Sequence, residues 1–347
     1  MKKLLITSIL LFQLLGWISC SKKGSQFIPG NLSDGKYDSE FPSRSSSEIL
    51  EKISHTVKMI NSIAYYEGYA FAENKHVTLE DILRGNYKNK SDSVISFHNS
   101  SSGTATIIYQ QNRRIAILTS AHVVEHPDTL ITYFISEETD TVQTIESFSL
   151  KKKQRNILVG IPDGSGFEIL AIEPDLDATV LGKEFINLPV EKIPVFYLPI
   201  GSAKELQWGS FVYLIGWPKG QPMVTRGIVS NPDRDKQHSF LIDALFNRGF
   251  SGGLVLAIRD GIPNLELVGV VGSVSASFEQ VLVPAEGKDS PASGPRLPYI
   301  EDIYIKNWQQ IDYGITYAIS IEAILEFLNN NKTEFEDNGY DFNRFFH

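Results

Sequence analysis

Three groups of residues in this sequence could together make a reactive serine. The first is Thr119-Ser120-Ala121-His122, the second is Asp177, and the third is Gly249-Phe250-Ser251-Gly252-Gly253. A serine hydroxyl is a weak nucleophile near neutral pH, so it needs a base within hydrogen-bond reach and an acid that orients the base. His122 is the candidate base and Asp177 the candidate acid. The chemistry predicted is acyl transfer through the hydroxyl of Ser251.

The glycines around Ser251 predict a site for the negative charge that develops during acyl transfer. Gly249 has no Cβ, so it permits a tight turn that aims the backbone N–H groups of Gly249 and Ser251 at one point. Such a pair is the predicted oxyanion hole, which is usually the largest single electrostatic contribution to this chemistry. Gly252 and Gly253 allow a neighbouring strand to approach closely.

Each group also has an ordinary structural explanation. A single histidine before two valines is often a packed strand residue, and glycine-rich turns are common. Asp175 stands two residues from Asp177 and competes for its role. Asp177 is preferred because the apolar residues 178–181 follow it directly. The prediction rests on the order His, Asp, Ser within a chain rich in strand patterns.

The order and the motifs resemble those of trypsin-like serine proteases, most of all the bacterial high-temperature-requirement (Deg-type) envelope proteases. The resemblance covers about residues 95–330. Residues 119–124 resemble the Thr-Asn-Ala-His-Val-Val of that branch, 216–220 its Gly-Asn-Pro-Phe-Gly, 224–230 its Val-Thr-x-Gly-Ile-Val-Ser, 243–244 its Asp-Ala, and 315–319 its closing Gly-Phe-Ala-Ile-Pro. The resemblance implies that His122, Asp177 and Ser251 form a catalytic triad.

The resemblance also implies the fold and the activity. The fold would be all-β, with two six-stranded antiparallel barrels and the cleft between them, His122 and Asp177 from the first barrel and Ser251 from the second. The activity would be that of a serine endopeptidase that hydrolyses peptide bonds of exported proteins through an acyl-enzyme, and the N-terminal pattern described below adds the expectation that it is tethered to a membrane. The alternative is a catalytically inactive binding or scaffold lipoprotein on the same fold, since Phe250 stands where the family has Asn or Asp.

Three residues are expected to line the substrate pocket: Leu245, Phe246 and Gly272. Leu245 is the sixth residue before Ser251, where trypsin-like pockets that bind Arg or Lys hold a carboxylate. An apolar pocket would penalise an unpaired cation through its desolvation. The sequence therefore predicts a preference for small or aliphatic side chains before the scissile bond.

The N-terminus has the pattern of a bacterial export signal. Lys2 and Lys3 precede a mostly apolar run over residues 4–18, and Ser19 stands directly before Cys20, as in a lipoprotein signal. We expect residues 1–19 to be a signal peptide, Cys20 to be lipidated, and residues 20–45 to be a flexible tether. The expected location is the bacterial cell envelope, with attachment to the outer membrane preferred over the inner membrane. Cys20 is the only cysteine, so no intramolecular disulfide can form.

Composition and spacing argue against several other functions. The net charge of −9 argues against nucleic-acid binding. No metal-ligand spacing or phosphate-binding loop is present, so neither a metal nor a cofactor is expected, and the expected partners are protein or peptide substrates. The basic residues 151–153 are predicted to lie in a solvated loop.

The remaining pattern predicts the elements around these residues. Residues 46–94 are expected to form a helical extension, because apolar residues at 46–60 have helical spacing and a second helix begins near Thr78. The protease domain is predicted at 95–332, with a structureless insertion at 275–312 and a final helix at 321–329 capped by Ser320. Residues 333–347 are predicted to be a tail, too short for the PDZ domain that Deg-type proteases usually carry. The predicted strands are residues 104–109, 115–120, 130–134, 167–172, 211–215, 224–230, 240–242, 254–258 and 267–274.

Overall fold

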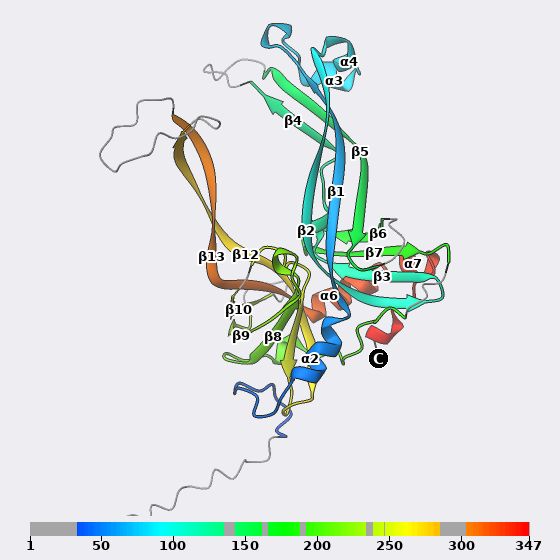
Figure 1. The fold of residues 1–347 in the computed structure, drawn as a ribbon, viewed down its shortest axis with the longest axis vertical. Helices are drawn as coiled ribbons and strands as arrows, with labels where there is room; N and C mark the ends of the chain where they lie inside the picture. The colour runs from blue at the N-terminus through cyan, green and yellow to red at the C-terminus, as the bar shows by residue number, and fades with distance from the viewer. Residues whose placement is uncertain are drawn as a thin grey trace, which may run out of the picture. The chain divides into compact units, whose positions relative to one another are not determined.

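The computed structural model describes residues 33–134, 143–161, 166–187, 192–233, 239–245, 247–284 and 303–346. The chain divides into two compact units, Met1–Gly35 and Lys36–His347, and every element named below belongs to the second. Most of the described residues lie in antiparallel strands, which form two β-structures one after the other along the chain (Figure 1).

The first β-structure is a curled sheet with the strand order β4-β5-β1-β2-β3-β7-β6. Its six strands other than β4 close on themselves where the Phe167 N–H donates to the Asn156 carbonyl oxygen at 2.7 Å, in an isolated bridge between the end of β5 and the start of β6. Alternate residues face an apolar interior in which Ile107, Ile117 and Leu181 are fully buried. The strands are β1 Val57–Ala70, β2 Ser93–Gln111, β3 Arg114–Thr119, β4 Thr129–Tyr133, β5 Ile145–Leu158, β6 Glu168–Glu173 and β7 Ala178–Glu184.

Three strands of this sheet continue past the closed part as a long twisted ribbon. β1 pairs with β2 from Val57↔Thr106 to Ala70↔Ser93 without a register shift, and its other side pairs with β5. The far end of the ribbon carries β4 and two short helices, α3 (Leu79–Leu83) and α4 (Tyr87–Lys90) (Figure 1). A separate apolar cluster that includes Phe71, Val77 and Phe148 holds this end together.

The second β-structure is a closed six-stranded barrel with the order β10-β13-β12-β11-β8-β9. Val212, Leu214, Phe240 and Val255 fill its interior without exposed surface. Its strands are β8 Phe211–Gly216, β9 Met223–Asn231, β10 Phe240–Ala244, β11 Leu254–Ile258, β12 Leu265–Pro284 and β13 Ile303–Ser320. The closed barrel and the curled sheet confirm the prediction of an all-β, trypsin-like double barrel.

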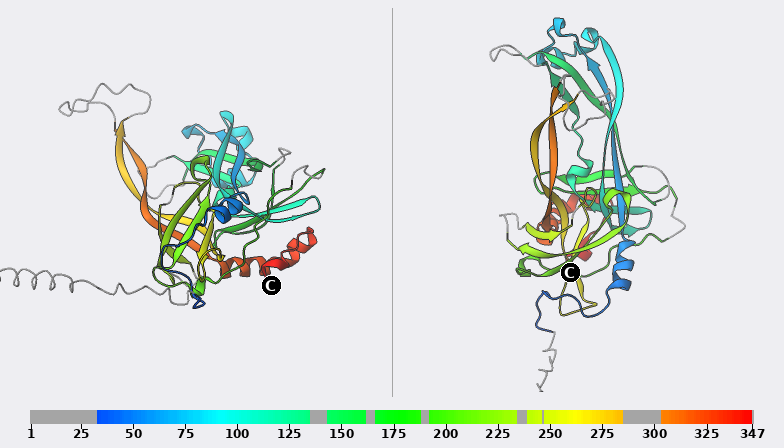
Figure 2. Two further views of the ribbon diagram at one scale, coloured as in Figure 1. Left: turned by 60° about the horizontal axis from the view of Figure 1, so that its bottom comes forward. Right: turned by 60° about the vertical axis from the view of Figure 1, so that its left-hand side comes forward.

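The remaining elements are helices at the two ends and single turns between strands. Near the C-terminus, α6 packs on β12 and β13, and α7 contacts β6 (Figure 2). The Ser320 hydroxyl accepts a hydrogen bond from Ala323 N at 3.2 Å, so the predicted cap of the final helix is confirmed. The helical elements not yet named are α2 Ser47–Ser54, η1 Glu73–Lys75, α5 Ala121–Val124, η2 Ala203–Glu205, η3 Pro218–Gly220, α6 Ile321–Asn330, α7 Lys332–Asp337 and η4 Asn343–Phe345.

Several predicted segments have a different structure. The helical prediction for residues 46–94 is correct for α2 and α3 but wrong for β1, which pairs with β2 inside the first sheet, so the predicted domain boundary at residue 95 cuts through that sheet. The predicted tether is wrong from residue 36 onward. Tyr37 is buried in the second barrel, and its backbone bridges Arg259.

Two more segments that were predicted to lack regular structure contain strands. Within residues 275–312, the described parts extend β12 and β13 as a hairpin that pairs as far as Pro284↔Ile303. The basic residues 151–153 lie on β5, not in a loop, because β5 is held between β1 and β4. The predicted tail is also packed, since Tyr340, Phe342 and Phe345 are buried in an apolar cluster with Tyr109 at its edge.

Candidate active site

His122 stands on the short helix α5 at the end of β3. Its side chain is 49% exposed, so the packed strand histidine considered from the sequence is not what the structure has. Its neighbours Ala121 and Val123 are buried and fix the helix to the barrel. The histidine ring is therefore held by a rigid element and remains accessible to a substrate.

Asp177 lies beside the His122 ring. It ends the turn before β7 with a left-handed backbone (φ 59°), and β7 pairs with β3 next to α5. The Nδ1 atom of His122 lies 2.9 and 2.8 Å from the two carboxylate oxygens, and the His122 backbone N–H donates to Oδ1 at 2.9 Å. Asp175 lies in the preceding turn, and no hydrogen bond joins it to His122 in the described chain.

The contact with Asp177 determines the tautomer of His122. An ionised carboxylate can only accept hydrogen bonds, so Nδ1 must carry the proton. The lone pair of the neutral ring is then on Nε2, the atom that faces away from the carboxylate. A histidine in this state can take a proton from a hydroxyl group, and the carboxylate stabilises the imidazolium that results.

Ser251 stands on a turn between β10 and β11, and this turn contacts β2 close to the helix α5 that carries His122. Its carbonyl oxygen accepts from Thr104 N–H at 2.8 Å. A Cβ added to Gly103 would lie 3.0 Å from that oxygen and 2.6 Å from a methyl group of Val123, the residue after His122. β2 thus holds the serine turn against α5. Within the described residues no hydrogen bond joins the Ser251 hydroxyl to the His122 ring; in free enzymes this contact is often long and tightens when substrate binds.

Two backbone N–H groups of the serine turn have no acceptor among the residues that the structure describes. Neither Gly249 N nor Ser251 N makes a hydrogen bond within the described part of the chain, whereas Phe250 N–H between them donates to Asn247 O at 3.2 Å. Most buried backbone donors in folded proteins are paired. Two unpaired donors on one turn are available to a ligand atom that carries negative charge.

The turn η3 fixes the peptide that carries one of these donors. The Arg248 carbonyl oxygen accepts from Lys219 N–H at 3.1 Å. Since the C=O and N–H of a trans peptide point in opposite directions, the N–H of Gly249 is directed away from η3. Gly249 has φ +104°, and a Cβ there would lie 2.8 Å from the Trp217 carbonyl oxygen. Both the backbone angle and the close approach require glycine at this position.

Thr104 ties this loop to the first sheet, a role that the sequence did not suggest. Its hydroxyl donates to Gly249 O at 2.6 Å and accepts from Trp217 N–H at 2.8 Å. The Thr104 carbonyl oxygen accepts from the Thr119 hydroxyl at 2.6 Å. Thr104 therefore uses its N–H, C=O and hydroxyl groups to join β2, β3, η3 and the serine turn.

Phe250 anchors the serine turn from the side of the second barrel. Its side chain has no exposed surface and belongs to the apolar cluster that includes Leu214 and Val255. The ring lies so close to Gly216 that a Cβ there would be 2.6 Å from Phe250 Cδ1. The residue that departs from the family pattern thus packs in the barrel core and leaves the turn intact.

Two of the predicted pocket residues, Leu245 and Gly272, lie on the strands or strand ends that flank β13. Ala244, the residue before Leu245, accepts from the Thr316 hydroxyl at 3.4 Å, and β12 pairs with β13 at Val271↔Ala318, directly before Gly272. Leu245 is 64% exposed and can contact a ligand without rearrangement. Phe246 and Cys20 lie outside the described residues.

The fold and this geometry agree with a comparison of known families. Residues 103–270 match the family model described as a trypsin-like peptidase domain. This part of the chain is a trypsin-like peptidase domain. The matched residues include His122, Asp177 and Ser251, and the prediction of this family is confirmed.

Comparisons with individual proteins do not extend this family assignment. The crystal structure of the serine endoprotease from Yersinia pestis is similar to the chain, with 16% sequence identity over 84% of this chain and 68% of that chain and a TM-score of 0.39. The comparison with curated proteins found no match.

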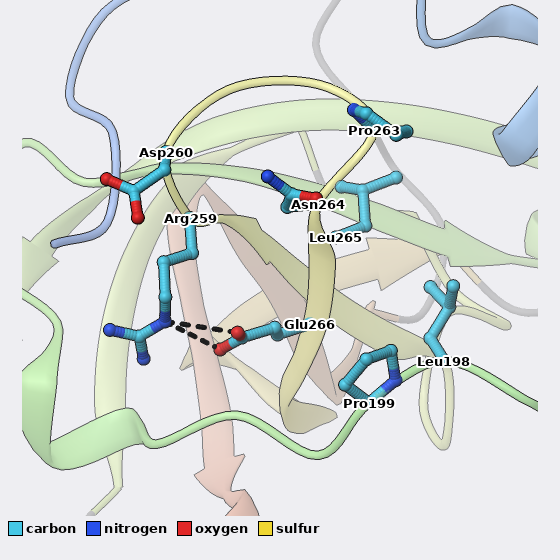
Figure 3. Close-up of a pocket in the computed structure, with 8 residues that line it drawn as sticks. All are labelled: Leu198, Pro199, Arg259, Asp260, Pro263, Asn264, Leu265 and Glu266. Atoms are coloured by element: carbon cyan, nitrogen blue, oxygen red, sulfur yellow. Dashed lines mark hydrogen bonds and ion pairs between the residues drawn. The ribbon is translucent and has the colours of Figure 1, made fainter. Parts of the chain in front are cut away.

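A separate hollow of about 390 Å³ lies at the turn between β11 and β12 (Figure 3). Its Arg259 donates through Nε to both oxygens of Glu266 at 3.1 Å and through Nη1 to Glu205 at 2.7 Å, and it covers the ring of Tyr37 at 4.1 Å. Burial raises the pKa of Tyr37, whose hydroxyl donates to Glu266 at 2.7 Å. These groups hold the N-terminal segment on the peptidase domain.

The described part of the chain holds neither a group of side chains that could bind a metal ion nor a helix that could cross a membrane. Its His, Asp, Glu and Cys side chains form no group of three that could hold a metal ion. None of its helices is long and apolar enough to cross a membrane.

Proposed function

We propose that this protein is a serine endopeptidase in which Ser251 is the nucleophile, His122 the general base and Asp177 the orienting acid. The observation that carries the proposal is the contact of His122 Nδ1 with both Asp177 oxygens, at 2.9 and 2.8 Å, in an exposed ring beside the serine turn. This contact leaves Nε2 able to accept the Ser251 proton as the hydroxyl oxygen attacks the peptide carbonyl carbon.

The remaining steps follow from the same residues. The carbonyl oxygen becomes an oxyanion, and the N–H groups of Gly249 and Ser251 are the donors available to stabilise it. The protonated His122 then gives its proton to the leaving amine, and the C–N bond breaks to leave an acyl-enzyme on Ser251. A water molecule, deprotonated by His122, hydrolyses the ester and regenerates the hydroxyl.

A fluorophosphonate probe tests the proposal directly, because it reacts with an activated serine and needs no known substrate. The folded wild-type protein should be labelled at Ser251, and Ser251→Ala should not be labelled. Release of fluorescent fragments from an unfolded, dye-labelled casein should follow the same pattern. A folded wild-type protein that neither labels nor degrades casein would refute the enzyme and favour the binding or scaffold alternative.

We further propose that Cys20 carries acyl chains and tethers the peptidase domain to a membrane of the bacterial cell envelope, where exported proteins would be its substrates. The support is the sequence alone: two lysines, an apolar run and a small residue directly before the cysteine. Mass spectrometry of the mature N-terminus tests this proposal. An unmodified cysteine, or partition of wild type and Cys20→Ser alike into the aqueous phase of a detergent extraction, would contradict it.

A further inference from the structure

The ribbon leaves one long strand edge open next to the serine turn. Over residues 93–102, β2 pairs with β1 on one side, and no described residue pairs with its other side. The same side of β2 is occupied further along, first by Ser251 at Thr104 and then by β3 from Thr106. The open edge is therefore continuous with the position of the nucleophile.

The register shows which groups face this edge. Thr104 N–H points away from β1, because it donates to Ser251 O. Along a strand the N–H and C=O of one residue point to the same side and those of the next residue to the opposite side. No register shift interrupts the pairing with β1 between these positions. The N–H and C=O groups that face the open edge therefore belong to Val94, Ser96, His98, Ser100 and Ser102.

This edge lacks the features that usually prevent strand addition. Natural edge strands are short or carry Lys, Pro or inward charges. Residues 93–103 contain no Asp, Glu, Lys, Arg or Pro, and at about 3.3 Å per residue they span roughly 30 Å. The edge strand at the other side of the ribbon, β4, has only five residues and follows Pro127-Asp128 directly. Val94 and Ile95 are 57% and 55% exposed, which leaves apolar surface for an added strand.

We propose that the open edge of β2 binds an extended segment of the substrate polypeptide by strand addition, beside the scissile bond. The inference rests on the proposed function. The substrate is the expected occupant because the open edge runs up to the nucleophile: a chain that pairs with residues 94–102 meets the serine turn where β2 reaches Gly103. Backbone hydrogen bonds would supply the affinity. The substrate class is thus unfolded polypeptide that can extend over several residues on one side of the cleaved bond.

Peptides of graded length test the proposal. One short peptide with a cleavable bond is compared with the same peptide extended by eight uncharged, β-branched and aromatic residues at either end. Extension at one end should raise kcat/KM by about tenfold or more, since about 1.4 kcal/mol of added binding gives a factor of ten. Every second N–H group of an added strand faces β2. N-methylation of those alternate residues of the extension should therefore remove the gain in kcat/KM, whereas N-methylation of the residues between them should preserve it. Equal kcat/KM for the short and both extended peptides would overturn the proposal.

Two variants at Ser96 separate the contribution of the open edge to kcat/KM from the contribution of the catalytic residues. Ser96→Pro removes an edge-facing N–H and leaves the ladder with β1, and Ser96→Ala keeps that N–H as the matched control. The length-dependent gain should disappear in Ser96→Pro and persist in Ser96→Ala, while both variants cleave the short peptide at the wild-type rate. A folded Ser96→Pro protein that keeps the full gain would contradict strand addition.

Binding without turnover distinguishes this inference from the proposed function. Ser251→Ala should bind the fluorescent extended peptide at least tenfold more tightly than the short one, measured by anisotropy. If no peptide is cleaved by wild type but this difference is found, the proposed function fails and the edge site stands. If sedimentation shows that Ser96→Pro dissociates a dimer and the extension adds no affinity, the occupant is a second copy of this chain and the inference is wrong.

Discussion

The hydroxyl of Thr104 donates a hydrogen bond to the carbonyl oxygen of Gly249 at 2.6 Å and accepts one from Trp217 N–H. Thr104 belongs to the first sheet, and Gly249 carries one of the two N–H groups of the serine turn that have no acceptor among the described residues. This contact fixes the peptide that joins Gly249 to Phe250, which lies between the two peptides that carry the N–H groups of Gly249 and Ser251. A residue of β2 therefore positions the proposed oxyanion hole without touching the substrate.

Thr104→Val should impair catalysis more than substrate binding. The isosteric change leaves Gly249 O and Trp217 N–H without a partner, and each unsatisfied buried group costs about 1–3 kcal/mol. We expect kcat to fall by about 10- to 100-fold with little change in KM, and affinity for a peptide boronic acid to fall in parallel. Thr104→Ser keeps the hydroxyl and should recover most of the rate. A Val variant that loses thermal stability but keeps kcat would show a purely structural role.

Substitutions in the proposed triad should have unequal effects. Ser251→Ala and His122→Ala remove the nucleophile and the base, so peptide hydrolysis should be lost while the proteins stay folded. Asp177→Asn should lower kcat by roughly 10⁴, because an amide can favour the wrong tautomer of the histidine. Asp175→Asn is the matched control and should leave kcat within about twofold of wild type on that mechanism. Peptide kinetics at pH 7.5 measure this, and a larger loss for Asp175→Asn would mean that the acid is misassigned.

Gly249→Ala should abolish activity because the substitution displaces the backbone of the serine turn. The left-handed backbone costs a non-glycine residue about 1–2 kcal/mol, and the new Cβ would also meet Trp217 O at 2.8 Å. The turn must shift, and the N–H of residue 249 shifts with it. Gly261→Ala is the control, since Gly261 also has a positive φ but has open space around it. Both variants should lose thermal stability, and only Gly249→Ala should lose hydrolysis; equal activities would show that the turn tolerates displacement.

The strands of the two barrels were predictable because their patterns are local. The runs near residues 115–120, 211–215 and 254–258 are apolar and bounded by turn residues, and all three form strands. The ribbon was not predictable in this way. The helical spacing of Ile53, Val57 and Ile60 crosses from α2 into β1, where the buried polar Ser62 hides the period of two. Pairing with distant strands decides the structure there.

The residues of the candidate site likewise comprise some that could be predicted from the sequence and some that could not. His122, Asp177 and Ser251 could be found because their chemistry restricts the residue types and because the family motifs surround them. Thr104 could not, because its partner Gly249 is 145 residues away and a threonine after a glycine has no distinctive pattern. The support from Lys219 comes through its backbone N–H, which every residue except proline possesses.

His126 should make the folded state sensitive to acid. Burial, and then the nearby charge of Lys151, lower the pKa of His126, and its Nε2 lies 3.0 Å from the Ser62 hydroxyl. Below about pH 6.5 the unfolded chain binds a proton that the folded chain resists, so the free energy of unfolding falls as the pH decreases, and above that pH the effect vanishes. Urea denaturation at pH 7, 6 and 5 should show a smaller loss for His126→Gln than for wild type. His55→Gln, at an exposed position, is the control, and identical pH slopes for all three proteins would contradict the prediction.

The activity of the peptidase domain should not depend on a newly released N-terminus. In zymogen-type trypsins the released α-amine pairs with an Asp just before the serine, and this ion pair orders the oxyanion hole. Phe250 occupies that position here, and a phenyl ring buried against Gly216 cannot accept the ion pair. The N-terminal segment is also held elsewhere, since Asp38 N–H donates to Ile258 O at 2.8 Å.

A protein that begins at residue 33 should therefore have the same kcat/KM with and without additional residues at its N-terminus. The packing of Phe250 takes the place of the ion pair, so Phe250→Ala should cost about 3–5 kcal/mol of stability and lower kcat, while Phe250→Leu should retain more of both. Peptide hydrolysis and thermal unfolding of the four proteins measure these effects. Hydrolysis that appears only after trimming to one defined N-terminus would show that the serine turn is ordered by that terminus and not by the phenylalanine ring.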